Sequence, residues 1–134
     1  MQFNATVGLI GTKETFVSEQ NTAKTYGSGA LEVFATPAMI GLMEGAAMNA
    51  AQADLPEGYG TVGTWIDVKH VAATPIGMKV TATAELMEVN GKRLVFQVEA
   101  RDESGIIGEG KHERYIVEEE KFLARTNSKL SSLH

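Results

Sequence analysis

The chain contains no cysteine among its 134 residues. This absence excludes disulfide bonds, zinc sites with cysteine ligands, iron–sulfur clusters and thiol nucleophiles. No apolar run approaches the ~20 residues that a bilayer span needs. The N-terminal stretch MQFNATVGLIGTKETF has neither a basic region nor a long apolar segment. We therefore expect neither secretion nor membrane insertion, and we expect a cytoplasmic location.

Positive charge is also scarce, because the formal net charge at pH 7 is −5. A nucleic-acid-binding protein normally carries a basic surface, so a small-molecule partner is expected instead. Apolar residues make up 43% of the chain and charged residues 22%, close to the average of soluble globular proteins. The length suits one hydrophobic core. We predict a single domain over residues 1–134, with a flexible C-terminal tail at about 124–134.

Several common catalytic motifs are missing. The sequence has no Gly-x-x-x-x-Gly-Lys-Ser/Thr phosphate-binding loop and no Gly-x-Ser-x-Gly nucleophile elbow. The three histidines, His70, His112 and His134, lack the close helical pairing of a zinc enzyme. We therefore expect no nucleotide cofactor and no metal.

The most informative segment runs from Thr36 to about Ala53 and is predicted to be a helix. Thr36 is expected to cap the free amides, and Pro37 suits the first helical position because it has no amide to lose. Glu44 is the only charged side chain in PAMIGLMEGAAMNAAQA, and apolar residues cover every face. Such a helix is typically buried. A curved sheet wrapped around it would supply the cover.

The remaining sequence has the pattern of that sheet. One strand is expected at 13–18, before the helix. Four more are expected in hairpin succession, at 60–73, 78–89, 93–102 and 106–117. Asn90-Gly91 is a strong two-residue hairpin signal. Alternation places Val62, Ile66, Val68 and His70 on one face. An antiparallel sheet curled around one helix is an α+β architecture, and the hot-dog fold matches it.

Three stretches also carry a family resemblance. VFATPAMIGLMEGAAMNAA at 33–51, GTWIDVKHVAATPIG at 63–77 and EGKHERYIV at 109–117 resemble the hot-dog acyl-CoA thioesterases related to fluoroacetyl-CoA thioesterase. The similarity covers nearly the whole chain. It implies a homodimer, or a dimer of dimers, that hydrolyses a short acyl-CoA thioester. Coenzyme A is then part of the substrate, and no separate cofactor is implied.

The resemblance also implies roles for individual residues. By motif, the catalytic group maps onto Thr36, Glu44 and His70. Gly63 is expected near the thioester carbonyl, and Arg114 belongs to the His-Glu-Arg motif of the last strand and is expected to contact substrate. Glu44 is expected either to activate water or to attack the carbonyl directly.

One segment departs from the family pattern. Residues 27–30 read Gly-Ser-Gly-Ala, where the fluoroacetyl-specific enzyme has a lid containing phenylalanines. We therefore expect a more open acyl pocket. Phe34 is expected to line this pocket, and three methionines either join it or pack in the core: Met39, Met43 and Met48.

The spacing of the catalytic group leaves its assembly open. Eight residues separate Thr36 from Glu44, which corresponds to about 12 Å along a straight helix. Either Thr36 lies on a bend before the helix, or a two-fold dimer brings one residue in from the partner. Two other functions also remain open. These are a hot-dog hydratase-dehydratase that acts on enoyl- or hydroxyacyl-thioesters, and a non-catalytic acyl-CoA-binding protein.

Overall fold

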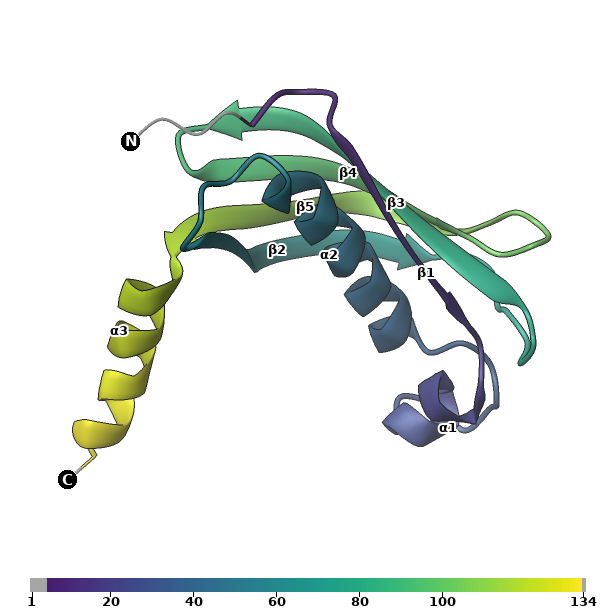
Figure 1. Cartoon of the computed structure of the whole chain (residues 1–134). Helices are drawn as coiled ribbons and strands as arrows, with labels where there is room; N and C mark the ends of the chain where they lie inside the picture. Colours follow the sequence, from purple (N-terminus) through teal and green to yellow (C-terminus); the bar gives the residue numbers. More distant parts are fainter. Residues whose placement is uncertain (1–4, 134) are drawn as a thin grey trace.

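The computed structural model describes residues 5–133 and contains one curved, five-stranded antiparallel sheet. The long helix α2 lies in the concave side of the sheet (Figure 1). The sheet order is β1-β3-β4-β5-β2. The strands are β1 (Ile10–Phe16), β2 (Tyr59–His70), β3 (Lys79–Asn90), β4 (Arg93–Arg101) and β5 (Ile106–Glu118). The helices are the 3-10 turn η1 (Glu19–Asn21), α1 (Ala23–Tyr26), α2 (Thr36–Gln52) and α3 (Glu119–Ser131). The predicted α+β class is confirmed.

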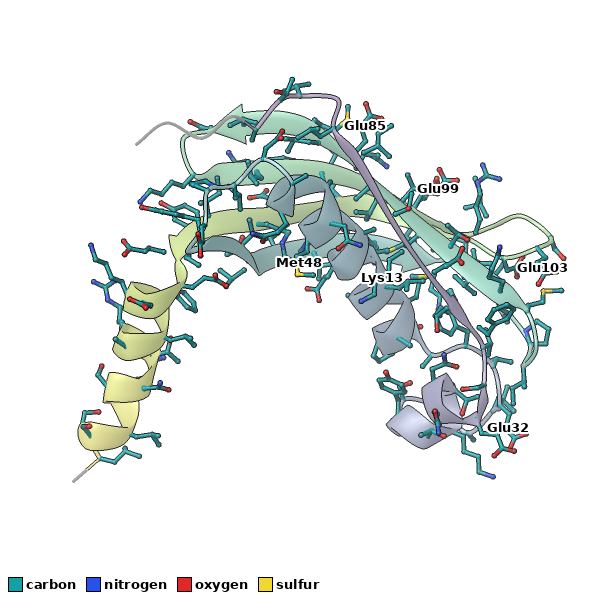
Figure 2. All side chains as sticks on the ribbon, in the orientation of Figure 1. Lys13, Glu32, Met48, Glu85, Glu99 and Glu103 are labelled. Carbon is teal, nitrogen blue, oxygen red and sulfur yellow. The ribbon has the colours of Figure 1, made fainter. Side chains whose placement is uncertain are left out.

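The core lies between α2 and the concave face of the sheet. Alternate residues of β3 and β4, such as Leu86 and Phe96, are fully buried against the helix. The buried residues of α2 are Met39, Leu42, Met43, Gly45, Ala46, Ala47, Ala50 and Ala51. The opposite side of α2 is open, and Met48 there is 40% exposed and points away from the sheet (Figure 2). The curved sheet therefore wraps the helix as predicted, but it covers only one side and leaves the side that carries Met48 exposed.

The order of the strands corrects another prediction. Asn90-Gly91 joins β3 to β4 as expected, and Gly91 adopts a left-handed φ of 64° that suits glycine. However, β2 pairs with β5 rather than with β3, so it does not join the hairpin succession. The connection 71–78 carries the chain past β5 and β4 to β3, so β2 and β3 run in opposite directions but are not neighbours in the sheet. As a result β2 is an edge strand of the sheet.

The C-terminal end differs from the predicted tail. Residues 119–131 form α3, so most of the range 124–134 is regular helix. None of its residues is buried, and the helix extends away from the sheet (Figure 1). Phe122 and Leu130 are apolar and lie eight residues apart, a spacing found on one face of a helix. This helical pattern is weak because most residues of the segment are polar. No helix within residues 5–133 is long and apolar enough to cross a membrane.

Candidate active site

Thr36 begins α2 but does not cap it. The N-cap is Ala35, and no side chain caps this helix end. The Thr36 hydroxyl is instead 2.7 Å from Nδ1 of His70, which is the last residue of β2. The expected capping role is therefore wrong, since the side chain points across to the sheet. The structure brings Thr36 and His70 together, as the resemblance implied.

His70 is half-buried, and this burial lowers the pKa of its imidazole, an effect that the Ala72 backbone opposes. Its Nε2 is buried and has no hydrogen-bond partner among residues 5–133. In one tautomer the Thr36 hydroxyl donates to Nδ1 and Nε2 carries the proton. In the other, Nδ1–H donates to Thr36, which leaves the hydroxyl proton for another acceptor. Either way, the pair keeps one polar group available for a ligand.

A cavity of about 290 Å³ opens beside this pair. Thr36 and His70 line it together with Phe34 and Ser28. Phe34 is only 1% exposed, so its ring both packs in the core and forms part of the cavity wall. The Thr36–His70 pair therefore faces an open cavity rather than the packed core.

The second part of the site depends on a bulge in β2. The pairing of β2 with β5 shifts register between Gly63 and Trp65, so that Gly63 lies opposite Arg114 and Ile66 lies opposite His112. A bulge reverses the alternation of side chains along a strand. Val62 therefore does not share a face with Ile66, and that prediction is wrong. Gly63 faces α2 instead.

Three side chains converge on Gly63. A Cβ atom at this position would lie 3.0 Å from Oε1 of Glu44, 3.2 Å from Cε1 of His112 and 3.4 Å from Nη1 of Arg114. Only glycine leaves this space free. Within residues 5–133, the half-buried Glu44 carboxylate has no hydrogen bond and no ion pair. A carboxylate held beside a guanidinium, but not paired with it, is free to act on a bound molecule.

Arg114 is fixed more firmly than Glu44. Its Nε donates to Oγ1 of Thr61 at 2.7 Å, and its Nη2 donates to the Thr61 carbonyl at 2.9 Å. The side chain is 6% exposed, and burial lowers the pKa of the guanidinium, while the charge of Glu44 opposes that shift. Thus the structure places Glu44, Gly63 and Arg114 in one cluster.

The two groups remain separate within one chain. Thr36 lies inside α2 rather than on a bend before it, so it stands about 12 Å from Glu44 along the helix axis. No cluster of three or more histidine, cysteine, aspartate or glutamate side chains that could hold a metal occurs in the described part of the chain. The described chain therefore contains a Thr36–His70 pair and a distinct Glu44–Arg114 cluster.

Sequence reasoning named His112 as one of the three histidines and gave it no role in the site. The available signal was the spacing of two within the His-Glu-Arg motif. Alternation along a strand puts such residues on the same face. His112 is fully buried beside Arg114 in the structure.

Comparison with known proteins first defines the class as a thioesterase with the hot-dog fold. A hypothetical protein of Thermus thermophilus, described as a thioesterase superfamily member, aligns with a TM-score of 0.88 and 28% identity, covering 96% of each chain. A hot-dog-like protein from Thermanaerovibrio acidaminovorans aligns with a TM-score of 0.83 and 31% identity, covering 92% of this chain and 91% of that chain. The predicted fold is confirmed.

The particular family follows from closer matches. The family model of fluoroacetyl-CoA-specific thioesterases matches residues 17–120. The fluoroacetyl-CoA thioesterase of Streptantibioticus cattleyicolor is 50% identical over 98 residues, which are 73% of this chain and 70% of that protein. A structure of fluoroacetyl-CoA thioesterase aligns with a TM-score of 0.86 and 42% identity, covering 92% of this chain and 96% of that chain. The chain belongs to this family and is a thioester hydrolase, which favours hydrolysis over the hydratase and non-catalytic alternatives.

Proposed function

We propose that this thioesterase hydrolyses small acyl-CoA thioesters with Glu44 as the group that starts the reaction. The observation that carries the proposal is the unpaired carboxylate beside Gly63 and Arg114. An ion pair would hold the carboxylate in place and weaken it as a base or nucleophile. Here a thioester carbonyl can approach the space over Gly63 and meet both the carboxylate and the guanidinium.

The proposed reaction replaces a C–S bond with a C–O bond. Glu44 takes a proton from water while the water oxygen attacks the acyl carbon, or the carboxylate attacks that carbon itself and water cleaves the resulting anhydride. In both routes negative charge develops on the carbonyl oxygen. Arg114 keeps one N–H on each Nη after its three hydrogen bonds, and these are suitable donors for that oxygen. Collapse of the intermediate expels the coenzyme A thiolate.

Thr36 and His70 are proposed to act on the same substrate. The Thr36 hydroxyl lines the cavity and is suited to hydrogen-bond the acyl group or the intermediate. Because burial lowers the pKa of His70, the imidazole is neutral at pH 7 and can accept a proton there. Structures of the related fluoroacetyl-CoA thioesterase include a threonine-to-alanine variant with fluoroacetate and a threonine-to-serine variant with acetyl-CoA, which supports a role for a threonine.

We propose that two chains share each site as a homodimer, which is the unit of any larger dimer of dimers. The separation of Thr36 from Glu44 within one chain supports this arrangement, since one substrate atom cannot touch both. The edge strand β2 and the open side of α2 offer surfaces for a second copy: Trp65 is 45% exposed and Met48 is 40% exposed. Pairing across a two-fold axis would cover that edge. The lack of cysteine supports a proposed cytoplasmic location.

The test of the function is thiol release from a panel of short, branched and aromatic acyl-CoA thioesters. Glu44→Gln keeps the shape of the side chain but removes the base, so we expect kcat to fall by about 10²- to 10⁴-fold. Glu85→Gln is the matched control, because Glu85 is an exposed carboxylate on the outer face of β3 (Figure 2). A folded Glu44→Gln protein that releases thiol at the wild-type rate would overturn the proposal.

A further inference from the structure

His112 is a buried histidine whose protonation state can be assigned from its contacts. It lies in β5 with 0% exposure, and its ring is 6.5 Å from that of Phe96 at a tilt of 31°. Its Nδ1 is 2.7 Å from the Trp65 carbonyl oxygen. A carbonyl only accepts, so Nδ1 carries the proton. In the neutral ring, Nε2 is then a bare acceptor.

That acceptor faces Arg114. Nη1 of Arg114 is 3.2 Å from His112 Nε2 and donates to it. Thr61 holds the other side of the guanidinium through Nε and Nη2. Nη1 is also the Arg114 atom that points toward Gly63, because it would lie 3.4 Å from a Cβ there and Oε1 of Glu44 would lie 3.0 Å from the same Cβ. His112 is therefore the only partner within residues 5–133 that holds the end of Arg114 facing the Glu44 carboxylate.

We propose that His112 is a positioning residue that aims Nη1 of Arg114 at the thioester carbonyl over Gly63. The inference rests on the proposed function and adds a requirement to it. His112 must be neutral, because protonated Nε2 would present a donor to a donor and push the guanidinium away. Trp65 sets this tautomer through its carbonyl, so the bulge in β2 also helps to aim Arg114.

The charges around His112 support the neutral form. Burial lowers the pKa of His112, and the charge of Arg114 lowers it further. The hydrogen bond to Trp65 and the carboxylates of Glu44 on α2 and Glu113 on β5 act in the opposite direction. The net result is a pKa below the ordinary value, so the imidazole is neutral at pH 7.

The His112 imidazole makes two hydrogen bonds, and each of two substitutions keeps only one of them. His112→Asn keeps an amide donor near the position of Nδ1, and His112→Gln places an amide oxygen near the position of Nε2. If the contact with Arg114 matters, His112→Asn lowers kcat by about 10- to 100-fold and His112→Gln retains most of it. If His112 had a purely structural role, the two variants would lose equal amounts of kcat or His112→Gln would lose more. The losses would then follow the decrease in melting temperature. Either of these outcomes would overturn the proposal.

A double-mutant cycle tests whether His112 acts through Arg114. We expect His112→Asn to lower kcat in the wild type but to have no further effect in an Arg114→Ala background. Independent losses that multiply would overturn the inference. Thiol release by the wild-type enzyme is measured first: an inactive wild type refutes the proposed function, whereas an active wild type with multiplying losses refutes only the role of His112.

Spectroscopy of the wild-type protein tests the proposal even if the variants do not fold. Long-range ¹H–¹⁵N NMR spectra distinguish the two imidazole tautomers. The expected result is a proton on Nδ1 of His112 at pH 7, with protonation of Nε2 at lower pH accompanied by loss of kcat. A proton on Nε2 at pH 7, or full kcat after Nε2 is protonated, would overturn the proposal.

Discussion

The Thr36–His70 pair and the Glu44–Arg114 cluster each take one residue from α2, but hydrogen bonds hold the side chains of the two groups differently. Thr36 is exposed and makes one hydrogen bond, to His70, beside an open cavity. Arg114 is buried and makes three, to Thr61 and His112. A buried charge that loses its partners is costly, so its neighbours must fix it in advance. An exposed hydroxyl carries no such cost, which leaves Thr36 adaptable toward different acyl groups.

The unsatisfied atoms of the two groups also differ. At the first turn of α2, the unpartnered atom is the buried Nε2 of His70. At Gly63, it is the Glu44 carboxylate, which has a cation nearby and no ion pair within residues 5–133. An unpaired carboxylate is the stronger nucleophile or base, whereas a neutral imidazole suits proton transfer. The difference supports the proposal that the Glu44 cluster carries out bond formation, whereas the Thr36 pair binds the acyl group and transfers protons.

Mixing inactive subunits tests whether the two groups meet across a dimer, and this is the largest expected effect. Thr36→Ala is expected to keep at most about a tenth of the wild-type rate, and Glu44→Gln still less. If each site takes Thr36 from one chain and Glu44 from the other, a mixed dimer contains one intact site. Random pairing of equal amounts then restores about a quarter of the wild-type rate. Co-expression with two affinity tags and a thiol-release assay measures this recovery.

The control for this experiment uses two variants of the same group. Thr36→Ala mixed with His70→Ala should restore nothing, because every mixed site still lacks one member of the pair. Light scattering must show dimers in both mixtures. Mixed dimers of Thr36→Ala and Glu44→Gln that stay inactive would place the whole site in one chain and refute the shared arrangement. A purely monomeric wild type at micromolar concentration would refute it as well.

A smaller effect is expected from the hydroxyl of Thr36 alone. Thr36→Val removes the hydrogen bond to His70 Nδ1, so we expect kcat to fall by about 10- to 100-fold. Thr36→Ser keeps the hydroxyl and should retain most of the activity. Because Thr36 is exposed, the valine variant should lose only about 1 kcal/mol of unfolding free energy. Kinetics and thermal unfolding of both variants measure these effects, and equal losses of kcat in the two would contradict a role for the hydroxyl.

Much of the fold followed from the sequence because its signals are local. Thr36-Pro37 and the long apolar segment fixed α2 to within one residue of its observed end, Gln52. Asn90-Gly91 fixed the β3–β4 turn. The position of β2 at the edge of the sheet could not be predicted from local sequence. It depends on pairing with β5, which lies far along the chain, and no pattern within either strand specifies that partner.

The site was less predictable for the same reason. The resemblance selected Glu44, Gly63 and Arg114, but simple alternation put Val62, not Gly63, on the face of Ile66. The bulge between Gly63 and Trp65 reverses this assignment, and a one-residue irregularity leaves little trace in composition. His112 was passed over because its spacing of two from Arg114 indicates only that the two residues share a strand face and does not indicate what the imidazole contacts. Only its contacts with Trp65 and Arg114 show what it does.

The smallest expected effect is in the choice of acyl group, and it follows from the openness of the Thr36 region. Ser28 lines the cavity, residues 27–31 are exposed, and none of them is aromatic. We therefore expect kcat/KM for fluoroacetyl-CoA and acetyl-CoA to differ by less than about tenfold, with higher values for some larger acyl chain. Ser28→Phe would narrow the cavity and should shift the preference back toward two-carbon groups, while thiol release from acetyl-CoA changes little. Specificity constants across the acyl-CoA panel measure both effects. A strong preference of the wild-type enzyme for fluoroacetyl-CoA over every other thioester would show that selectivity does not depend on bulk in this loop, and would direct the search to the Glu44 cluster instead.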